Sequence, residues 1–238
     1  MMKLLTIATI TVLSIPLQLT GTTIDLDFST LPSAQGWTFI TQDPLLTEST
    51  VFSVAGGRLL QNTIGIGEDV AHYDRTGVNL YDPSLPFELS LNAQVLREEV
   101  FPPPDISRGL YFGVTFDHLS AAFGIGPDRV SYSSFVGGYF NVPFDAHSAS
   151  HTYTLRWDPT AGLFSYLIDG SSIASAPGDV IRYPGTIPPY IFFGDERGNA
   201  EASISSMEFT QAPEPATGWL VSLVAAAGFV AMKLRAAR

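Results

Sequence analysis

The chain has 238 residues, no cysteine and a formal net charge of −11 at pH 7. The lack of cysteine excludes a disulfide framework and thiolate chemistry, and the negative charge argues against nucleic acid and anionic lipid as partners, because like charges repel. With 21 Gly, 17 Pro and 12% aromatic residues, the composition favours one all-β domain of short strands and turns over a helical bundle.

The first residues have the order of a secretory signal. Met1-Met2-Lys3 gives a positively charged start, and residues 4–15 form an apolar stretch that is too short to span a membrane. We expect a signal helix within residues 1–23, with cleavage near the small residues Gly21 to Thr23. An N-terminal anchor is the alternative. Either interpretation predicts export across the inner membrane.

The body of the chain, residues 24–212, alternates apolar and polar residues, as half-buried strands do. The clearest alternating runs are Phe87–Val95, Leu110–Phe116 and His151–Trp157, and Leu163–Ile168 is also predicted to be a strand. Turn sequences such as Gly56-Gly57 and Asp169-Gly170 separate runs of this kind and indicate hairpins. The body is therefore predicted to be a sandwich of two antiparallel sheets.

Some parts of the body break the alternation. Arg97–Asp105 contains three consecutive prolines, which remove ladder donors, and Ser133–Ser150 contains a glycine pair among aromatic residues; both are predicted to be loops. The apolar parity changes near Ser205-Ser206, which predicts a β-bulge there. Trp37 and Trp157 are predicted to lie in the core.

Several short motifs of the body share a likeness to one superfamily. They are Tyr153–Pro159 with Gly162, then Ile168-Asp169-Gly170, Asp27–Thr30 with Gly36-Trp37, and Phe193-Gly194-Asp195. This set resembles the concanavalin A-like lectin/glucanase (laminin-G-like) sandwiches. The resemblance implies a jelly roll, a form that hosts lectins, hydrolases and structural modules alike, so the fold alone does not settle the function.

The sequence lacks the usual residues for cleaving a glycosidic bond. The glucanases of this superfamily carry the pattern Glu-x-Asp-x-x-Glu on one strand, and retaining hydrolysis needs two carboxyl groups about 5–5.5 Å apart. Here the only acid-x-acid pair is Asp25-Leu26-Asp27, without a downstream glutamate. The four histidines are scattered and give no zinc pattern. We therefore predict that the protein is not an enzyme, with a glycoside hydrolase as an alternative.

Two candidate binding sites remain. Lectin-like sandwiches often hold calcium through carboxylate oxygens, and pairing of the terminal strands would bring Asp27 and Asp195 together as ligands. The alternative is that Asp195 only caps its turn. Tyr139, Phe140 and Asn141 offer aromatic faces and an amide to a glycan. The alternative there is a loop that packs on its own sandwich.

The end of the chain contains three ordered features. Pro213-Glu214-Pro215 precedes an uncharged apolar run from Ala216 to Met232, and the basic residues Lys233, Arg235 and Arg238 follow. The run is at the short end of the ~17–25 residues of a transmembrane helix, and the basic cluster should stay cytoplasmic. This order resembles the PEP-CTERM sorting signal of Gram-negative bacteria that make extracellular polysaccharide. The resemblance implies recognition by an exosortase, a membrane protease that cuts near the motif; a plain C-terminal anchor is the alternative.

Together these features predict three parts: a signal peptide at 1–23, a jelly-roll sandwich at 24–212, and a sorting tail with a transmembrane helix at 213–238. The protein is expected as a membrane-anchored precursor and then at the cell surface or in the extracellular matrix. Its predicted function is non-catalytic binding of neutral extracellular polysaccharide. A structural matrix protein without a ligand is a second interpretation.

Overall fold

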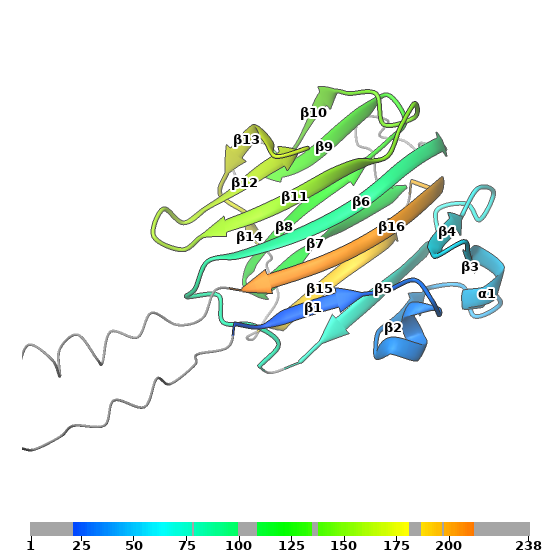
Figure 1. The fold of residues 1–238 in the computed structure, drawn as a ribbon, viewed down its shortest axis with the longest axis horizontal. Helices are drawn as coiled ribbons and strands as arrows, with labels where there is room; N and C mark the ends of the chain where they lie inside the picture. The colour runs from blue at the N-terminus through cyan, green and yellow to red at the C-terminus, as the bar shows by residue number, and fades with distance from the viewer. Residues whose placement is uncertain are drawn as a thin grey trace, which may run out of the picture. The chain divides into compact units, whose positions relative to one another are not determined.

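The computed structural model describes residues 21–77, 79–99, 109–134, 138–180, 187–196 and 198–211. These residues form strands in two layers, with a short 3-10 helix at Pro32–Gln35 and a short α1 at Glu48–Val51 (Figure 1). No helix within these ranges is long and apolar enough to cross a membrane. The predicted signal helix and the tail from Pro213 to Arg238 lie outside the described residues, and both stay predictions.

Sheet A has the strand order β13-β12-β11-β6-β16-β4-β3, and β1 also pairs with β16. Its strands are β1 (Thr23–Leu26), β3 (Phe52–Ala55), β4 (Arg58–Asn62), β6 (Phe87–Glu98), β11 (His151–Asp158), β12 (Leu163–Ile168), β13 (Ser171–Ala176) and β16 (Ala200–Gln211). The two longest strands, β6 and β16, lie side by side in the middle of the sheet.

Sheet B has the order β10-β9-β8-β7-β15-β5-β2, and β14 pairs with β8. Its strands are β2 (Thr38–Thr41), β5 (Val70–Thr76), β7 (Leu110–Asp117), β8 (Leu119–Ile125), β9 (Arg129–Ser134), β10 (Gly138–Pro143), β14 (Asp179–Val180) and β15 (Ile187–Glu196). All the strand pairs named in both sheets are antiparallel.

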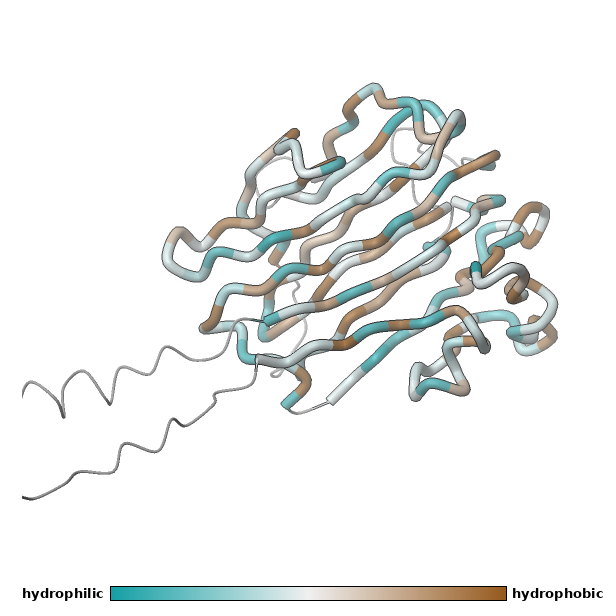
Figure 2. The backbone as a smooth tube through the Cα atoms, viewed as in Figure 1, coloured by the Kyte–Doolittle hydropathy of each residue, from teal (hydrophilic) through white to brown (hydrophobic). Residues whose placement is uncertain are grey.

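The core lies between the two sheets. Along β6 every second residue from Phe87 to Val95 is buried, and Figure 2 shows this alternation of hydropathy along the strands. Rings from sheet A meet rings from sheet B: Trp157 lies 5.4 Å from Phe116, and Tyr153 lies 5.6 Å from Phe123. The prediction of an all-β sandwich of two antiparallel sheets is confirmed, and the arrangement is consistent with a jelly roll.

Several finer predictions can be compared with the structure. Both Trp37 and Trp157 are buried, as predicted, and the register of β16 against β6 shifts between Ile204 and Ser206, which confirms the β-bulge. The prediction of a loop over Ser133–Ser150 is wrong, because β10 forms within it and pairs with β9. The reason is a side-chain contact that the glycines obscure in the sequence: Phe140 stacks on Tyr132 at 5.5 Å.

Candidate functional site

The outer face of sheet B gathers polar and aromatic side chains from strands that are distant in the sequence. Residues such as Tyr73, Phe112, Phe123 and Phe193 belong to the core, so their neighbours along each strand point to the opposite, outer face. The strand registers place His72, Gly194, Tyr111, Gly124, Ser131 and Asn141 in one row from β5 to β10. A parallel row begins with Asp74, Phe192, Gly113 and Ala122.

Three aromatic residues form the floor of this face. Tyr111 stacks on Phe192 with ring centroids 5.3 Å apart, and Tyr190 lies 5.8 Å from Phe192. Gly113 makes this possible, because a Cβ atom there would lie 2.7 Å from Phe192 Cζ and would overlap the carbonyl oxygen of Ala121. Tyr111 and Phe192 are 7% and 8% exposed, so the rings show a small part of their surface at the bottom of the face.

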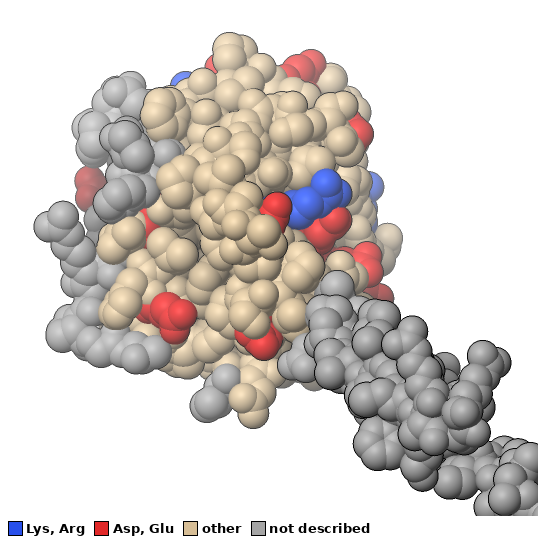
Figure 3. Space-filling view, turned by 90° about the vertical axis from the view of Figure 1, so that its left-hand side faces the viewer, with Lys and Arg blue, Asp and Glu red and all other residues tan. Residues whose placement is uncertain are grey.

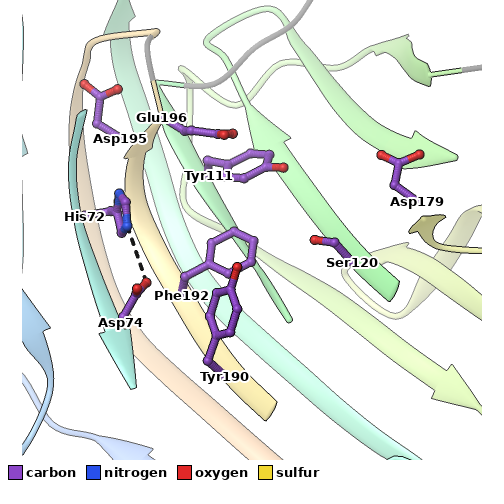
Figure 4. A pocket seen from close by; sticks show the side chains of 10 residues that line it. His72, Asp74, Tyr111, Ser120, Asp179, Tyr190, Phe192, Asp195 and Glu196 are labelled. Carbon is purple, nitrogen blue, oxygen red and sulfur yellow. Dashed lines mark ion pairs between the residues drawn. The ribbon is translucent and has the colours of Figure 1, made fainter. Parts of the chain in front are cut away.

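A cavity of about 300 Å³ opens above this floor (Figure 4). Its lining residues are His72, Asp74, Tyr111, Ser120, Asp179, Tyr190, Phe192, Gly194, Asp195 and Glu196. The volume is at the lower end of the range for small-molecule sites, about 300–1,000 Å³. Such a cavity combines apolar rings with a histidine and several carboxyl groups.

His72 and Asp74 form an ion pair within the cavity. His72 Nε2 lies 3.4 Å from Asp74 Oδ1, and each side chain is 22% exposed. Asp74 Oδ1 is buried and accepts no hydrogen bond from the described residues. On the neighbouring strand, Gly194 has a φ of +135°, and a Cβ there would lie 2.6 Å from His72 Cα. The absence of a side chain at Gly194 therefore leaves room between His72 and Tyr111.

The structure separates the three residues that the sequence suggested for glycan binding. Asn141 is exposed and pairs with Ser131, so it lies on the outer face of sheet B. Phe140 is 43% exposed and stacks on Tyr132, on the other side of β10. Tyr139 pairs through its backbone with Ser133, and its side chain is outside the described part of the structure.

The two predicted calcium ligands are also apart. The terminal strands do pair, β1 with β16, but Asp195 lies on β15 in the other sheet. Asp27 instead accepts hydrogen bonds from Ser29, which lower the pKa of its carboxyl group. Asp195 accepts a hydrogen bond from the Gly198 backbone, as expected of a turn cap. Among the described residues, no three His, Cys, Asp or Glu side chains are grouped to hold a metal ion.

The sequence reasoning missed the residues of the cavity. They come from β5, β7, β8, β14 and β15, and the sheet order brings together strands that are distant in the sequence, such as β5 and β15. A local signal did exist: His72 and Asp74 occupy alternate positions of a strand whose other face, with Ala71 and Tyr73, is fully buried.

Comparison with known proteins gives a fold but no relative. Neither protein-family models nor curated protein sequences match the chain. Among solved structures, a Bacillus licheniformis β-glucanase is similar, with 13% identity over 81% of this chain and 100% of that chain, at a TM-score of 0.52. An apo Crh5 transglycosylase has 13% identity over 82% of this chain and 86% of that chain, at 0.52.

A third structure, endo-1,3-β-glucanase from Streptomyces sioyaensis, has 12% identity over 76% of this chain and 90% of that chain, at a TM-score of 0.50. The likeness of these structures to this chain is one of fold, a sandwich of two antiparallel sheets. Because these neighbours are glucanases and a transglycosylase, the prediction that this protein is not an enzyme is wrong. It relied on one catalytic pattern on one strand, whereas the carboxyl groups of the cavity come from several strands.

Proposed function

We propose that this protein is a glycoside hydrolase or transglycosylase that acts on a neutral polysaccharide at the outer face of sheet B. The observation that carries the proposal is the cavity, where the rings of Tyr111, Tyr190 and Phe192 lie beside a histidine and carboxyl groups. Aromatic rings pack against the apolar faces of sugars, and carboxylates accept hydrogen bonds from hydroxyl groups. The neighbouring fold supports the choice of glycan chemistry.

The charge of the cavity supports a neutral substrate. Among the described lining residues, Asp74, Asp179, Asp195 and Glu196 are acidic, and no Lys or Arg is present. Such a site repels a polyanionic chain and accommodates the hydroxyl groups of a neutral one. Over the face that Figure 3 shows, acidic side chains are scattered rather than gathered in one patch, in keeping with a chain whose net charge is −11.

The acids that line the cavity come from β5, β14 and β15. Hydrolysis needs an acid at the leaving oxygen and a base or nucleophile at the other side of the bond. Among the described lining residues, β7 contributes only Tyr111, which is not a carboxylic acid. Asp74 on β5 and Glu196 on β15 are the acids beside the aromatic floor, and Asp179 on β14 lies farther along the face (Figure 4).

The sequences at the two ends of the chain support a location outside the cytoplasm for this activity. The signal-like start and the tail with Pro213-Glu214-Pro215 fit an exported precursor that an exosortase processes. In that case the enzyme would act on extracellular polysaccharide at the cell surface or in the matrix of the producing cell.

The proposal predicts turnover by the purified full-length protein. Incubation with β-1,3-glucan and with mixed-linkage β-glucan should release new reducing ends, or should transfer glucan to a labelled oligosaccharide acceptor, as measured by a reducing-sugar assay and mass spectrometry. A matched control is Asp25→Asn, because Asp25 is exposed on β1 in sheet A, outside the cavity, and its variant should keep full activity. Retention on glucan without reducing ends or transfer product would contradict the proposal.

A further inference from the structure

The cavity contains one histidine, and its position suggests a role in proton transfer. His72 is the only residue with a basic side chain among the described lining residues. Its Nε2 faces Asp74 Oδ1 at 3.4 Å, and that oxygen is buried without a hydrogen bond from the described residues. Asp74 therefore lies where it can orient the imidazole ring of His72.

The aromatic floor lies beside this pair. Asp74 lies directly opposite Phe192 in the register of β5 and β15, and His72 lies opposite Gly194. Directly opposite residues of an antiparallel pair have Cβ atoms about 4.5–5.5 Å apart. A sugar ring stacked on Phe192 and Tyr111 would therefore lie beside His72, above the space that Gly194 leaves open.

A carboxylate lies on the other side of His72. Glu196 lies opposite Val70, two positions along the strands from the His72–Gly194 pair, so Glu196 and His72 are diagonal neighbours. Diagonal neighbours are about 7–8 Å apart, within reach of long side chains. In an inverting glycosidase the two catalytic carboxyl groups are about 6.5–9.5 Å apart, which leaves room for a water molecule. The strand positions of His72 and Glu196 are compatible with a separation of that order between their side chains.

Resting on the proposed function, we propose that His72, held by Asp74, is the general acid of this site and that Glu196 is the general base. Protonated His72 donates a proton from Nδ1, the nitrogen away from Asp74, to the glycosidic oxygen as the bond from that oxygen to the anomeric carbon breaks. A water molecule attacks the anomeric carbon and gives a proton to Glu196. The bond is thus cleaved by net addition of one water, and solvent returns the proton from Glu196 to His72.

In this assignment the catalytic groups come from two strands, whereas the pattern Glu-x-Asp-x-x-Glu places them on one strand. The proton donor is on β5, the base is on β15, and Asp74 acts as a positioning residue that orients the ring and stabilises its charge. The other titratable groups among the described lining residues are Asp74, Tyr111, Asp179, Tyr190, Asp195 and Glu196.

The test compares two histidines, each beside an aspartate. His72→Gln should lower kcat/KM on β-1,3-glucan about 100-fold or more, as the loss of a general acid does. The control is His151→Gln, because His151 Nδ1 contacts Asp169 Oδ2 at 2.7 Å on sheet A, outside the cavity. That variant should keep the activity of the unmodified protein. Both variants should keep the affinity of the unmodified protein for glucan, measured by retention.

A second variant separates chemistry from structure. His72→Glu keeps an acid at this position, so it should recover part of the activity, with the alkaline limb of the kcat/KM profile moved to lower pH. Equal kcat/KM for His72→Gln and the unmodified protein would overturn the role of His72 and leave the proposed function intact. No turnover by the unmodified protein would overturn both.

Discussion

Replacement of Phe87 by alanine should lower the free energy of unfolding by about 4 kcal/mol, the cost typical of removing a large ring from a well-packed core. Phe87 begins β6 and is 2% exposed. Its ring lies within 6.5 Å of five others, those of Tyr81, Phe116, Trp157, Phe164 and Phe209. Because these rings come from both sheets, the substitution removes contacts that hold the two layers together.

A matched control for this variant is Phe140→Ala. Phe140 is 43% exposed at the edge strand β10 and contacts the ring of Tyr132. Removal of this ring should lower the free energy of unfolding by about 1 kcal/mol or less, the value of one aromatic contact at a solvated site. Urea denaturation measures the free energy of unfolding of both variants. The slopes of that free energy against urea concentration should be equal if both variants unfold in two states. Equal losses from the two variants would contradict the assignment of the core.

The second large effect is expected from Gly113→Ala. The new Cβ atom would lie 2.7 Å from Phe192 Cζ and 2.9 Å from Ala122 Cα, so the ring or the strand must move. Overpacking of this kind costs about 2 kcal/mol of stability. We also expect about a tenfold loss of glucan retention, equivalent to ~1.4 kcal/mol, because the aromatic floor no longer presents its surface to the sugar.

Gly77→Ala is the control for a glycine substitution. At Gly77 the closest atom to a new Cβ is 3.7 Å away, which is ordinary contact. Retention on glucan, measured by affinity electrophoresis, should therefore change for Gly113→Ala and stay constant for Gly77→Ala. Unchanged retention for both would mean that the Phe192 ring takes no part in binding.

The strands of the sandwich could be predicted because their pattern is local. In β6, β7 and β11 apolar residues recur at every second position. Burial follows that repeat in β6, whereas Leu110–Phe116 of β7 is buried on both faces. The β-bulge could be predicted for the same reason, since an extra residue changes the parity of β16. Strand β10 was missed because its glycine pair indicates a turn, and the stacking of Phe140 on Tyr132 is a contact between strands.

The candidate site could not be predicted because it depends on sheet order. Asp74 and Phe192 are opposite each other only because β5 pairs with β15, which comes more than a hundred residues later. A search for paired acids along one strand found Asp25 and Asp27, which belong to β1 and the turn after it in the other layer. Of the acids that line the cavity, Asp74 is on β5, Asp179 is on β14, and Asp195 and Glu196 are consecutive on β15. A spacing pattern along the sequence therefore does not identify them as one group.

The most direct test of a glycan site on the outer face of sheet B is a crystal structure of the protein with a bound β-1,3-gluco-oligosaccharide. We expect sugar rings in the cavity, in contact with Tyr111 and Phe192, with a glycosidic oxygen within hydrogen-bond distance of His72. An oligosaccharide bound instead on the outer face of sheet A, or at the edge strand β10 beside Phe140, would contradict the location of the site.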